Sequence, residues 1–161
     1  MVIYMKAIET ALSLTQAYKL GIERFEKMLG NEFSKAVESM YNTSTHIIIC
    51  GMGKSGLVGR KISSTLASTG TPSIFLHPAE AIHGDLGKVQ KQSVVLLISY
   101  SGETGEIISL IPALKRLDVT IIGLTGVKNS TLASKSDIVL DTSVDREACP
   151  LNLAPTTSTM I

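Results

Sequence analysis

Three hydroxyl side chains stand close together in residues 99–104 (Ser-Tyr-Ser-Gly-Glu-Thr), directly after an apolar run. Ser99, Ser101 and Thr104 lie at the expected start of a helix, and Gly102 lets the loop curl so that hydroxyl and backbone N–H groups converge. Such donors at the positive end of a helix bind phosphate without a large net charge. Ordinary N-capping by Ser101 or Thr104 is the alternative, but a cap needs only one hydroxyl. The loop therefore predicts a phosphate site.

A glycine-rich turn, residues 51–56 (Gly-Met-Gly-Lys-Ser-Gly), follows an earlier apolar run. Its G-x-G-x-x-G spacing is typical of dinucleotide sites. Such a site also needs an acidic residue at the end of the second strand, and residues 76–78 (Leu-His-Pro) provide none. The P-loop pattern fails as well, because Ile48 stands where its first glycine should be. We expect a tight turn that contacts a small anion through Gly53, Lys54 and Ser55. In the alternative interpretation the glycines only allow close helix–strand packing and Lys54 is solvated.

Two carboxylates, Glu106 and Glu147, are the candidates for proton transfer. Glu106 falls in the first turn of the helix after the hydroxyl loop, where complementing the helix dipole is worth about 0.3–1 kcal/mol. A carboxylate beside a phosphate is repelled by its ligand, so it costs affinity unless it takes part in the chemistry. Glu147 lies in a loop after the last expected strand, at the ligand end of the sheet; otherwise it is a solvated loop residue.

The histidines His77 and His83 flank a short segment that is followed by Asp85. The three side chains have the chemistry of metal ligands. No strict ligand spacing supports a metal, so we interpret the segment as a polar loop that shapes the pocket.

The elements that must position these residues alternate along the chain. Residues 5–41 carry apolar side chains at three- and four-residue steps, which predicts helices, with a break at Gly30-Asn31. Short, β-branched runs that are continuously apolar predict strands buried on both faces, at residues 46–50, 73–76, 94–98, 120–124 and 138–140. Helical stretches separate or follow them, at residues 55–69, from 78, at 104–117, which Pro112 weakens locally, and at 130–135. The alternation predicts an α/β fold with a doubly wound, five-stranded parallel sheet flanked by helices, and N-terminal helices that cover the sheet or a second subunit. In such a sheet, ligands bind beyond the carboxyl ends of the strands.

Composition narrows the function classes. The 161 residues are 44% hydrophobic and 18% charged, as expected of a globular domain, and the net charge of +1 offers no field for a nucleic acid. No apolar segment approaches the roughly 20 residues of a membrane span, and we expect no membrane partner. Cys50 and Cys149 lack metal-ligand spacing and fit a reducing compartment, which predicts a cytoplasmic protein.

Together these residues resemble the sugar isomerase (SIS) domain, and within it the D-arabinose-5-phosphate isomerases. The resemblance runs from about residue 46 to the end and rests on residues 51–56, 67–87, 99–104 and 146–156. The blocks His-Pro-Ala-Glu-Ala-Ile-His-Gly-Asp-Leu-Gly and Glu-Ala-Cys-Pro-Leu-Asn-Leu-Ala-Pro-Thr are specific to this isomerase group.

The resemblance implies interconversion of D-ribulose 5-phosphate and D-arabinose 5-phosphate, which supplies the sugar acid Kdo of lipopolysaccharide or capsules. Carried over by position, Ser99, Ser101 and Thr104 hold the phosphate, while Lys54, Glu106 and Glu147 belong to the active site. His83 matches a position linked to inhibitory zinc, and no metal or cofactor is required. Family members form tetramers, which places the N-terminal helices at subunit contacts.

The resemblance also bears on domain organisation. We expect an N-terminal helical segment over residues 1–44 and a SIS domain over 45–161. We expect this domain to be incomplete at its C-terminus, because a helix should start after Pro155 and the sequence reaches only Ile161. The pair of CBS modules and the later active-site histidine of full-length family members do not occur in these residues.

The implied chemistry is proton transfer between C1 and C2 through a cis-enediol. Glu147 is the first choice as base and Glu106 the second, with Lys54 stabilising the enediolate or the phosphate. A non-catalytic sugar-phosphate sensor is a second class, but its usual helix-turn-helix domain does not fit the first 45 residues. An isomerase of another ketose phosphate is a third.

Overall fold

Five short apolar strands form one parallel sheet at the centre of the computed structural model, which describes residues 2–149 and 156–160. The strands are β1 (Ile47–Gly51), β2 (Ser73–Leu76), β3 (Val94–Ile98), β4 (Thr120–Thr125) and β5 (Ile138–Asp141). Their order in the sheet is β2-β1-β3-β4-β5, and every neighbouring pair is parallel. The predicted fold class is confirmed.

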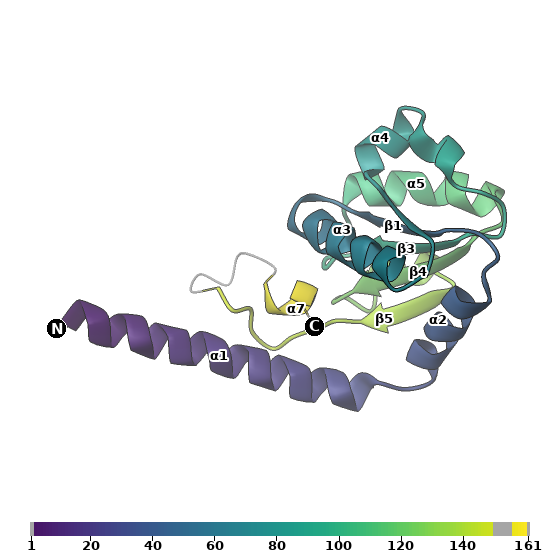
Figure 1. The fold of residues 1–161 in the computed structure, drawn as a ribbon. Coiled ribbons are helices and arrows are strands. Elements are labelled where there is room, and N and C mark those ends of the chain that lie inside the picture. The colour runs from purple at the N-terminus through teal and green to yellow at the C-terminus, as the bar shows by residue number, and fades with distance from the viewer. Residues whose placement is uncertain (1, 150–155, 161) are drawn as a thin grey trace.

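Helices cover both faces of the sheet, which explains why the strands are apolar throughout. On one face, α4 (Pro78–Ile82) and α5 (Gly105–Arg116) pack on alternate strand residues such as Ile48, Val95 and Ile121. On the other face, α2 (Asn31–Asn42) and α3 (Gly53–Ser68) pack on Ile47, Ile49 and their neighbours. The short elements η1 (Asp85–Lys88) and α6 (Thr131–Lys135) complete the connections. Figure 1 shows the sheet between these two layers.

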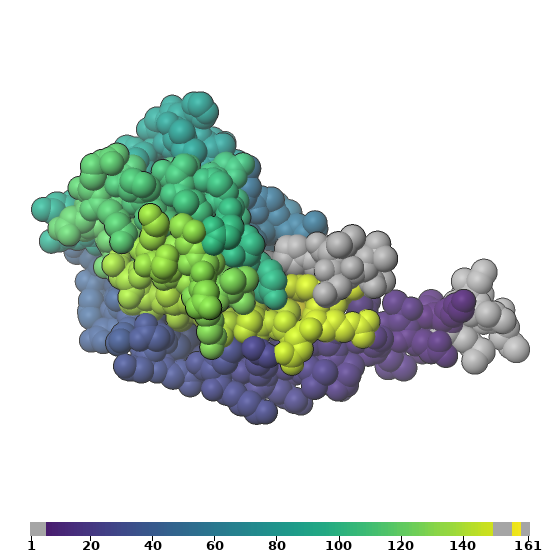
Figure 2. Space-filling view, turned by 180° about the vertical axis from the view of Figure 1, so that it is seen from behind, coloured from purple at the N-terminus to yellow at the C-terminus, as the bar shows by residue number. Residues whose placement is uncertain are grey.

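The N-terminal residues form two helices, as predicted. α1 (Val2–Met28) ends just before Gly30, and α2 folds back over the sheet with Ala36 and Met40 against it. Much of α1 extends past the sheet (Figure 1), and the Arg24 guanidinium holds it to the segment after β5 by an ion pair with Asp145 and a 2.9 Å hydrogen bond to Ser143. Figure 2 shows from behind that the segment after β5, in yellow, lies along α1.

The ends of two helices differ in detail from the sequence prediction. α3 begins at Gly53, two residues early, so Lys54 lies within its first turn. α5 continues through the exposed Pro112 to Arg116. The helix expected after Pro155 is represented by α7 (Thr157–Met160), which packs against α1 and α3; Pro155 itself lies outside the described residues. None of the helices in the described ranges is both long and apolar enough to cross a bilayer.

Candidate functional site

The strand order places a ligand site between β1 and β3. Along the chain, β1 is the first strand, β2 pairs with it on one side, and β3 then pairs with it on the other side. The loops after β1 and β3 therefore diverge and leave a crevice at the carboxyl edge of the sheet. A cavity of about 400 Å³ lies there, lined by residues 52–55 after β1 and by Ile98, Ser99, Tyr100, Ser101 and Thr104 around the end of β3.

The turn after β1 combines close packing with an open polar edge. A Cβ on Gly56 would lie 2.6 Å from the Gly51 carbonyl oxygen, so these two glycines let α3 approach the strand. Gly53 has a positive φ of 55° and open space around it, so it makes the turn itself. The close-packing interpretation of the motif therefore applies to Gly51 and Gly56, and the tight-turn interpretation applies to Gly53. Lys54 is exposed and lines the cavity, as do Gly53 and Ser55.

The hydroxyl loop after β3 is curled by its own hydrogen bonds. Ser99 is buried, and its hydroxyl lies 2.7 Å from that of Thr104 and accepts the Gly102 N–H at 3.1 Å. Ser101 is exposed and accepts the Glu103 N–H at 3.2 Å. Thr104 is the N-cap residue of α5, yet its side chain makes no capping hydrogen bond. Helix capping therefore does not account for these hydroxyls, and they surround the start of α5 on the cavity side.

Neighbouring elements hold this loop in place. The Glu103 carboxylate accepts the Thr131 N–H at 2.6 Å, and the Gly102 carbonyl accepts the Leu132 N–H at 3.0 Å, both at the start of α6. The hydrogen bond from the Thr131 backbone lowers the pKa of Glu103. Gly102 has a φ of 66° and packs directly on the Ser130 side chain, so no larger residue fits. The loop is thus preorganised before any ligand arrives.

Glu147 is buried, with 6% of its surface exposed, and its carboxylate is held by the segment that starts α7. One oxygen accepts the N–H groups of Thr156 at 2.8 Å, Thr157 at 2.7 Å and Ser158 at 3.3 Å. The other accepts the Ser158 hydroxyl. Burial acts to raise the pKa of Glu147, but the hydrogen bonds from Ser158 and Thr156 outweigh it and hold the pKa below its ordinary value. Glu147 is therefore an ionised, tightly positioned carboxylate rather than a solvated loop residue.

The predicted site residues fall into two groups. Gly53, Lys54, Ser55, Ser99, Ser101 and Thr104 line one cavity. Glu106, Glu147 and His83 do not line it: Glu106 is half-buried in the first turn of α5, and His83 is exposed at the end of α4. The Glu147 segment nevertheless reaches α3, because α7 packs against that helix, whose first turn carries Lys54.

Sequence reasoning missed three residues of the cavity wall, Met52, Ile98 and Tyr100. Their positions beside the two motifs were the only signal. Cys50 at the end of β1 is buried as expected, and burial raises the pKa of its thiol to about 12, so it is no nucleophile at neutral pH. Among the residues that the structure describes, no cluster of three or more His, Cys, Asp or Glu side chains could hold a metal ion.

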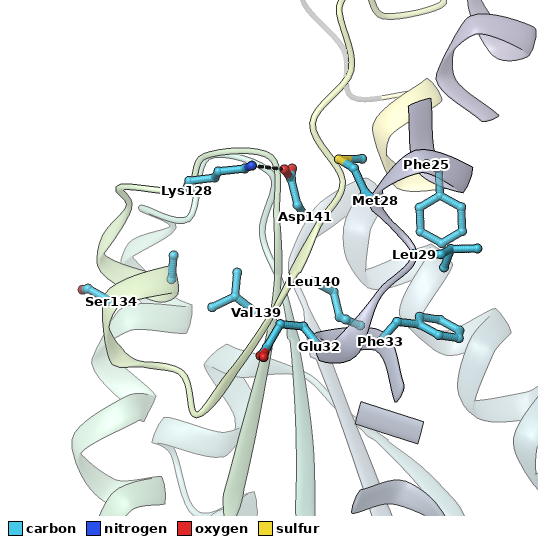
Figure 3. Close-up of a pocket in the computed structure, with 11 residues that line it drawn as sticks. Phe25, Met28, Leu29, Glu32, Phe33, Lys128, Ser134, Val139, Leu140 and Asp141 are labelled. Carbon is cyan, nitrogen blue, oxygen red and sulfur yellow. Dashed lines mark ion pairs between the residues drawn. The ribbon is translucent and has the colours of Figure 1, made fainter. Parts of the chain in front are cut away.

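A larger cavity, of about 480 Å³, lies away from this crevice beside β5 (Figure 3). Its wall is mostly apolar, with Phe25, Leu29 and Phe33 from the α1–α2 junction, and Lys128 forms a 3.1 Å ion pair with Asp141 at its rim. It lacks a convergent set of polar donors. Chemistry rather than size therefore assigns the candidate site to the crevice between β1 and β3.

Comparison with known proteins identifies the family of the chain. The profile of the SIS domain matches residues 40–161. The arabinose 5-phosphate isomerase KdsD of Pseudomonas aeruginosa is 54% identical over 133 residues, which are 83% of this chain and 41% of that protein. The chain thus spans less than half the length of the curated relative.

Two solved structures are similar over nearly the whole chain. The Escherichia coli CFT073 protein c3406, in complex with arabinose 5-phosphate, is 38% identical with a TM-score of 0.81, and the match covers 93% of this chain and 82% of that one. A protein of Listeria monocytogenes is 34% identical with a TM-score of 0.91, over 96% of this chain and 81% of that one.

Proposed function

The chain belongs to the SIS domain family, and from this premise we propose that it is the sugar-phosphate-binding domain of an arabinose 5-phosphate isomerase. The reaction would interconvert D-ribulose 5-phosphate and D-arabinose 5-phosphate. The observation that carries the proposal is the switch-point cavity, in which three hydroxyls and the Lys54 ammonium converge. The arabinose 5-phosphate complex of the E. coli relative supports the choice of sugar.

The phosphate would bind the loop after β3. Ser101 and Thr104 hydroxyls reach the cavity, and the start of α5 adds its positive dipole. Ser99 is buried and bonded to Thr104, so it orients that hydroxyl as well as facing the ligand. Phosphate binding by hydroxyls and a helix end needs no large positive field, in keeping with a net charge of +1.

Proton transfer between C1 and C2 would proceed through a cis-enediol with no redox cofactor. In the direction of ketose formation, a carboxylate removes the C2 proton and returns it to C1. Lys54 stabilises the charge that develops on the enediolate oxygen. Glu147 remains our first choice as base, because α7, which holds its carboxylate, packs against the helix that carries Lys54; Glu106 is the second.

The quaternary structure and cellular role are further parts of the proposal. Large apolar side chains exposed on α1 and α2 support a homotetramer, because their exposure to water is unfavourable; examples are Ile8, Leu12, Val37 and Tyr41. The product would enter Kdo synthesis for lipopolysaccharide or capsule, and the cytoplasmic location stays a prediction.

The test is turnover of D-ribulose 5-phosphate by the purified full-length protein, with the sugar products separated by chromatography. D-arabinose 5-phosphate as the product supports the proposal. Another aldose phosphate would identify a different isomerase, and binding without turnover would favour a sensor domain.

A further inference from the structure

Tyr100 stands between Ser99 and Ser101 in the loop after β3, and its ring lies on the backbone of Gly126. A Cβ on Gly126 would lie 2.6 Å from Cδ2 and 2.8 Å from Cζ of the ring, closer than real carbon contacts. The ring therefore occupies the space that a side chain at position 126 would fill. Gly126 directly follows β4, so the Tyr100 ring reaches from the end of β3 to the end of the neighbouring strand.

The main chain of Tyr100 is fixed to the same strand end. Its carbonyl oxygen accepts the Gly126 N–H at 3.0 Å and the Thr125 hydroxyl at 3.0 Å. Ring and carbonyl are thus both held by residues 125–126. Tyr100 is half-buried and lines the cavity beside Ser99 and Ser101, so it forms the part of the cavity wall next to the end of β4.

We propose that Tyr100 is a specificity-determining residue, whose ring limits the length of the sugar that extends from the phosphate loop. The inference rests on the proposed sugar-phosphate site. A phosphate held by Ser101 and Thr104 places the sugar carbons close to the Tyr100 side chain. The ring cannot move toward Gly126, because it already packs on the backbone of that residue.

A sixth carbon with its hydroxyl meets this wall. It must displace the ring from its packed position or leave a hydroxyl against an apolar surface without a partner. Five-carbon sugar phosphates stop short of the wall. One additional carbon group in a closed pocket is worth roughly 10–200-fold in discrimination.

The chain offers matched variants for a test. Tyr100→Ala removes the wall, whereas Tyr100→Phe keeps it. Gly126→Ala pushes the ring off the backbone and into the cavity. Gly87→Ala is its control, because a Cβ there meets no atom within 4 Å and Gly87 does not line the site.

The measurement is calorimetric affinity for D-arabinose 5-phosphate and for D-glucose 6-phosphate in the wild type and these variants. We expect wild type, Tyr100→Phe and Gly87→Ala to favour the pentose phosphate. Tyr100→Ala should reduce that preference by about tenfold or more. Gly126→Ala should weaken pentose phosphate binding, whereas the Gly87→Ala control should leave it unchanged.

The outcomes separate the two proposals. Pentose phosphate binding by the wild type with an unchanged preference in Tyr100→Ala would overturn the role of Tyr100 and leave the proposed function standing. A wild type without preference between the two sugars would do the same. A wild type that binds neither sugar phosphate would overturn the proposed function, and the role of Tyr100 with it.

Discussion

The hydroxyl oxygens of Ser99 and Thr104 lie 2.7 Å apart across the loop that joins β3 to α5. This hydrogen bond closes the loop, and Gly102 with its positive φ occupies the tip. Because Thr104 is bonded to Ser99 and not to the helix N–H groups, the start of α5 has no side-chain cap within the described residues. The first N–H groups of α5 therefore follow directly on Thr104, a residue of the cavity wall, without a side-chain cap from that residue, which suits them to phosphate.

Loss of the cavity hydroxyls should weaken sugar-phosphate binding. We expect Ser101→Ala and Thr104→Ala each to reduce affinity roughly ten- to a hundredfold, because a hydrogen bond to a charged group contributes about 1.5–3 kcal/mol. Thr104→Ser keeps the hydroxyl and should bind like the wild type. Titration calorimetry with D-arabinose 5-phosphate measures the effect, and unchanged affinity in both alanine variants would contradict a phosphate role.

Substitution of Glu147 and of Glu106 should show which of the two carboxylates is the base. In the full-length protein, Glu147→Gln should lower kcat at least about a hundredfold, the low end for a catalytic base, while substrate affinity is retained. The fold should persist, because an amide oxygen can still accept the Thr156, Thr157 and Ser158 N–H groups and the amide nitrogen can donate to the Ser158 hydroxyl.

Glu106→Gln is the matched comparison for that experiment. A smaller loss of kcat than in Glu147→Gln would support our assignment. If Glu106→Gln shows the larger loss, the roles are reversed, and if neither variant loses activity, carboxylate catalysis at these positions is refuted.

Acid should remove the stabilisation that Glu147 provides. Its pKa in the folded chain lies below the value of about 4.3 in unfolded chains. Its contribution is therefore complete above about pH 4.3 and is lost as the pH falls through the lower, folded value. We expect the difference in unfolding free energy between wild type and Glu147→Gln, measured by urea titration, to shrink from pH 7 to pH 3.

Asp141 titrates in the same range. Burial acts to raise its pKa, but hydrogen bonds from Ser143 and the Lys128 charge outweigh burial and lower the pKa as well. Asp141 is present in both proteins, so it cancels in the difference. A difference that stays constant down to pH 3 would show that Glu147 is not held as a buried anion.

The glycine motif should not bind nucleotides. β2 ends at Leu76 and is followed by His77, so no carboxylate lies at the position that holds a ribose. Calorimetry with NAD, NADP and ATP should give no specific heat of binding. Micromolar affinity for any of them would revive the dinucleotide interpretation.

The sequence was most informative where burial dictates residue type. All five strands lie where continuous β-branched runs predicted them, because both faces of each strand are covered. The curled hydroxyl loop and the tight turn before Lys54 could also be predicted as structures, because each depends on residues adjacent in the chain. Strand order then brings the two motifs together at one edge.

Contacts between distant segments could not be predicted in this way. The Glu147 carboxylate depends on the fold of residues 156–158, which no local pattern describes. No sequence pattern assigned a role to Tyr100, and only the structure shows its contact with Gly126. A glycine directly after a strand was the one available signal of that close approach.

Two lysines of α3 offer the most direct test of the central claim, that the crevice between β1 and β3 performs the isomerisation. Lys54 lines the cavity in the first turn, whereas Lys61, on the same helix, is bonded to Thr65 and lies outside it. We predict that Lys54→Met lowers kcat/KM for D-ribulose 5-phosphate by about 10²–10³-fold, the usual effect of removing one electrostatic stabiliser, and that Lys61→Met leaves it unchanged. Equal activity of Lys54→Met and Lys61→Met would contradict the account.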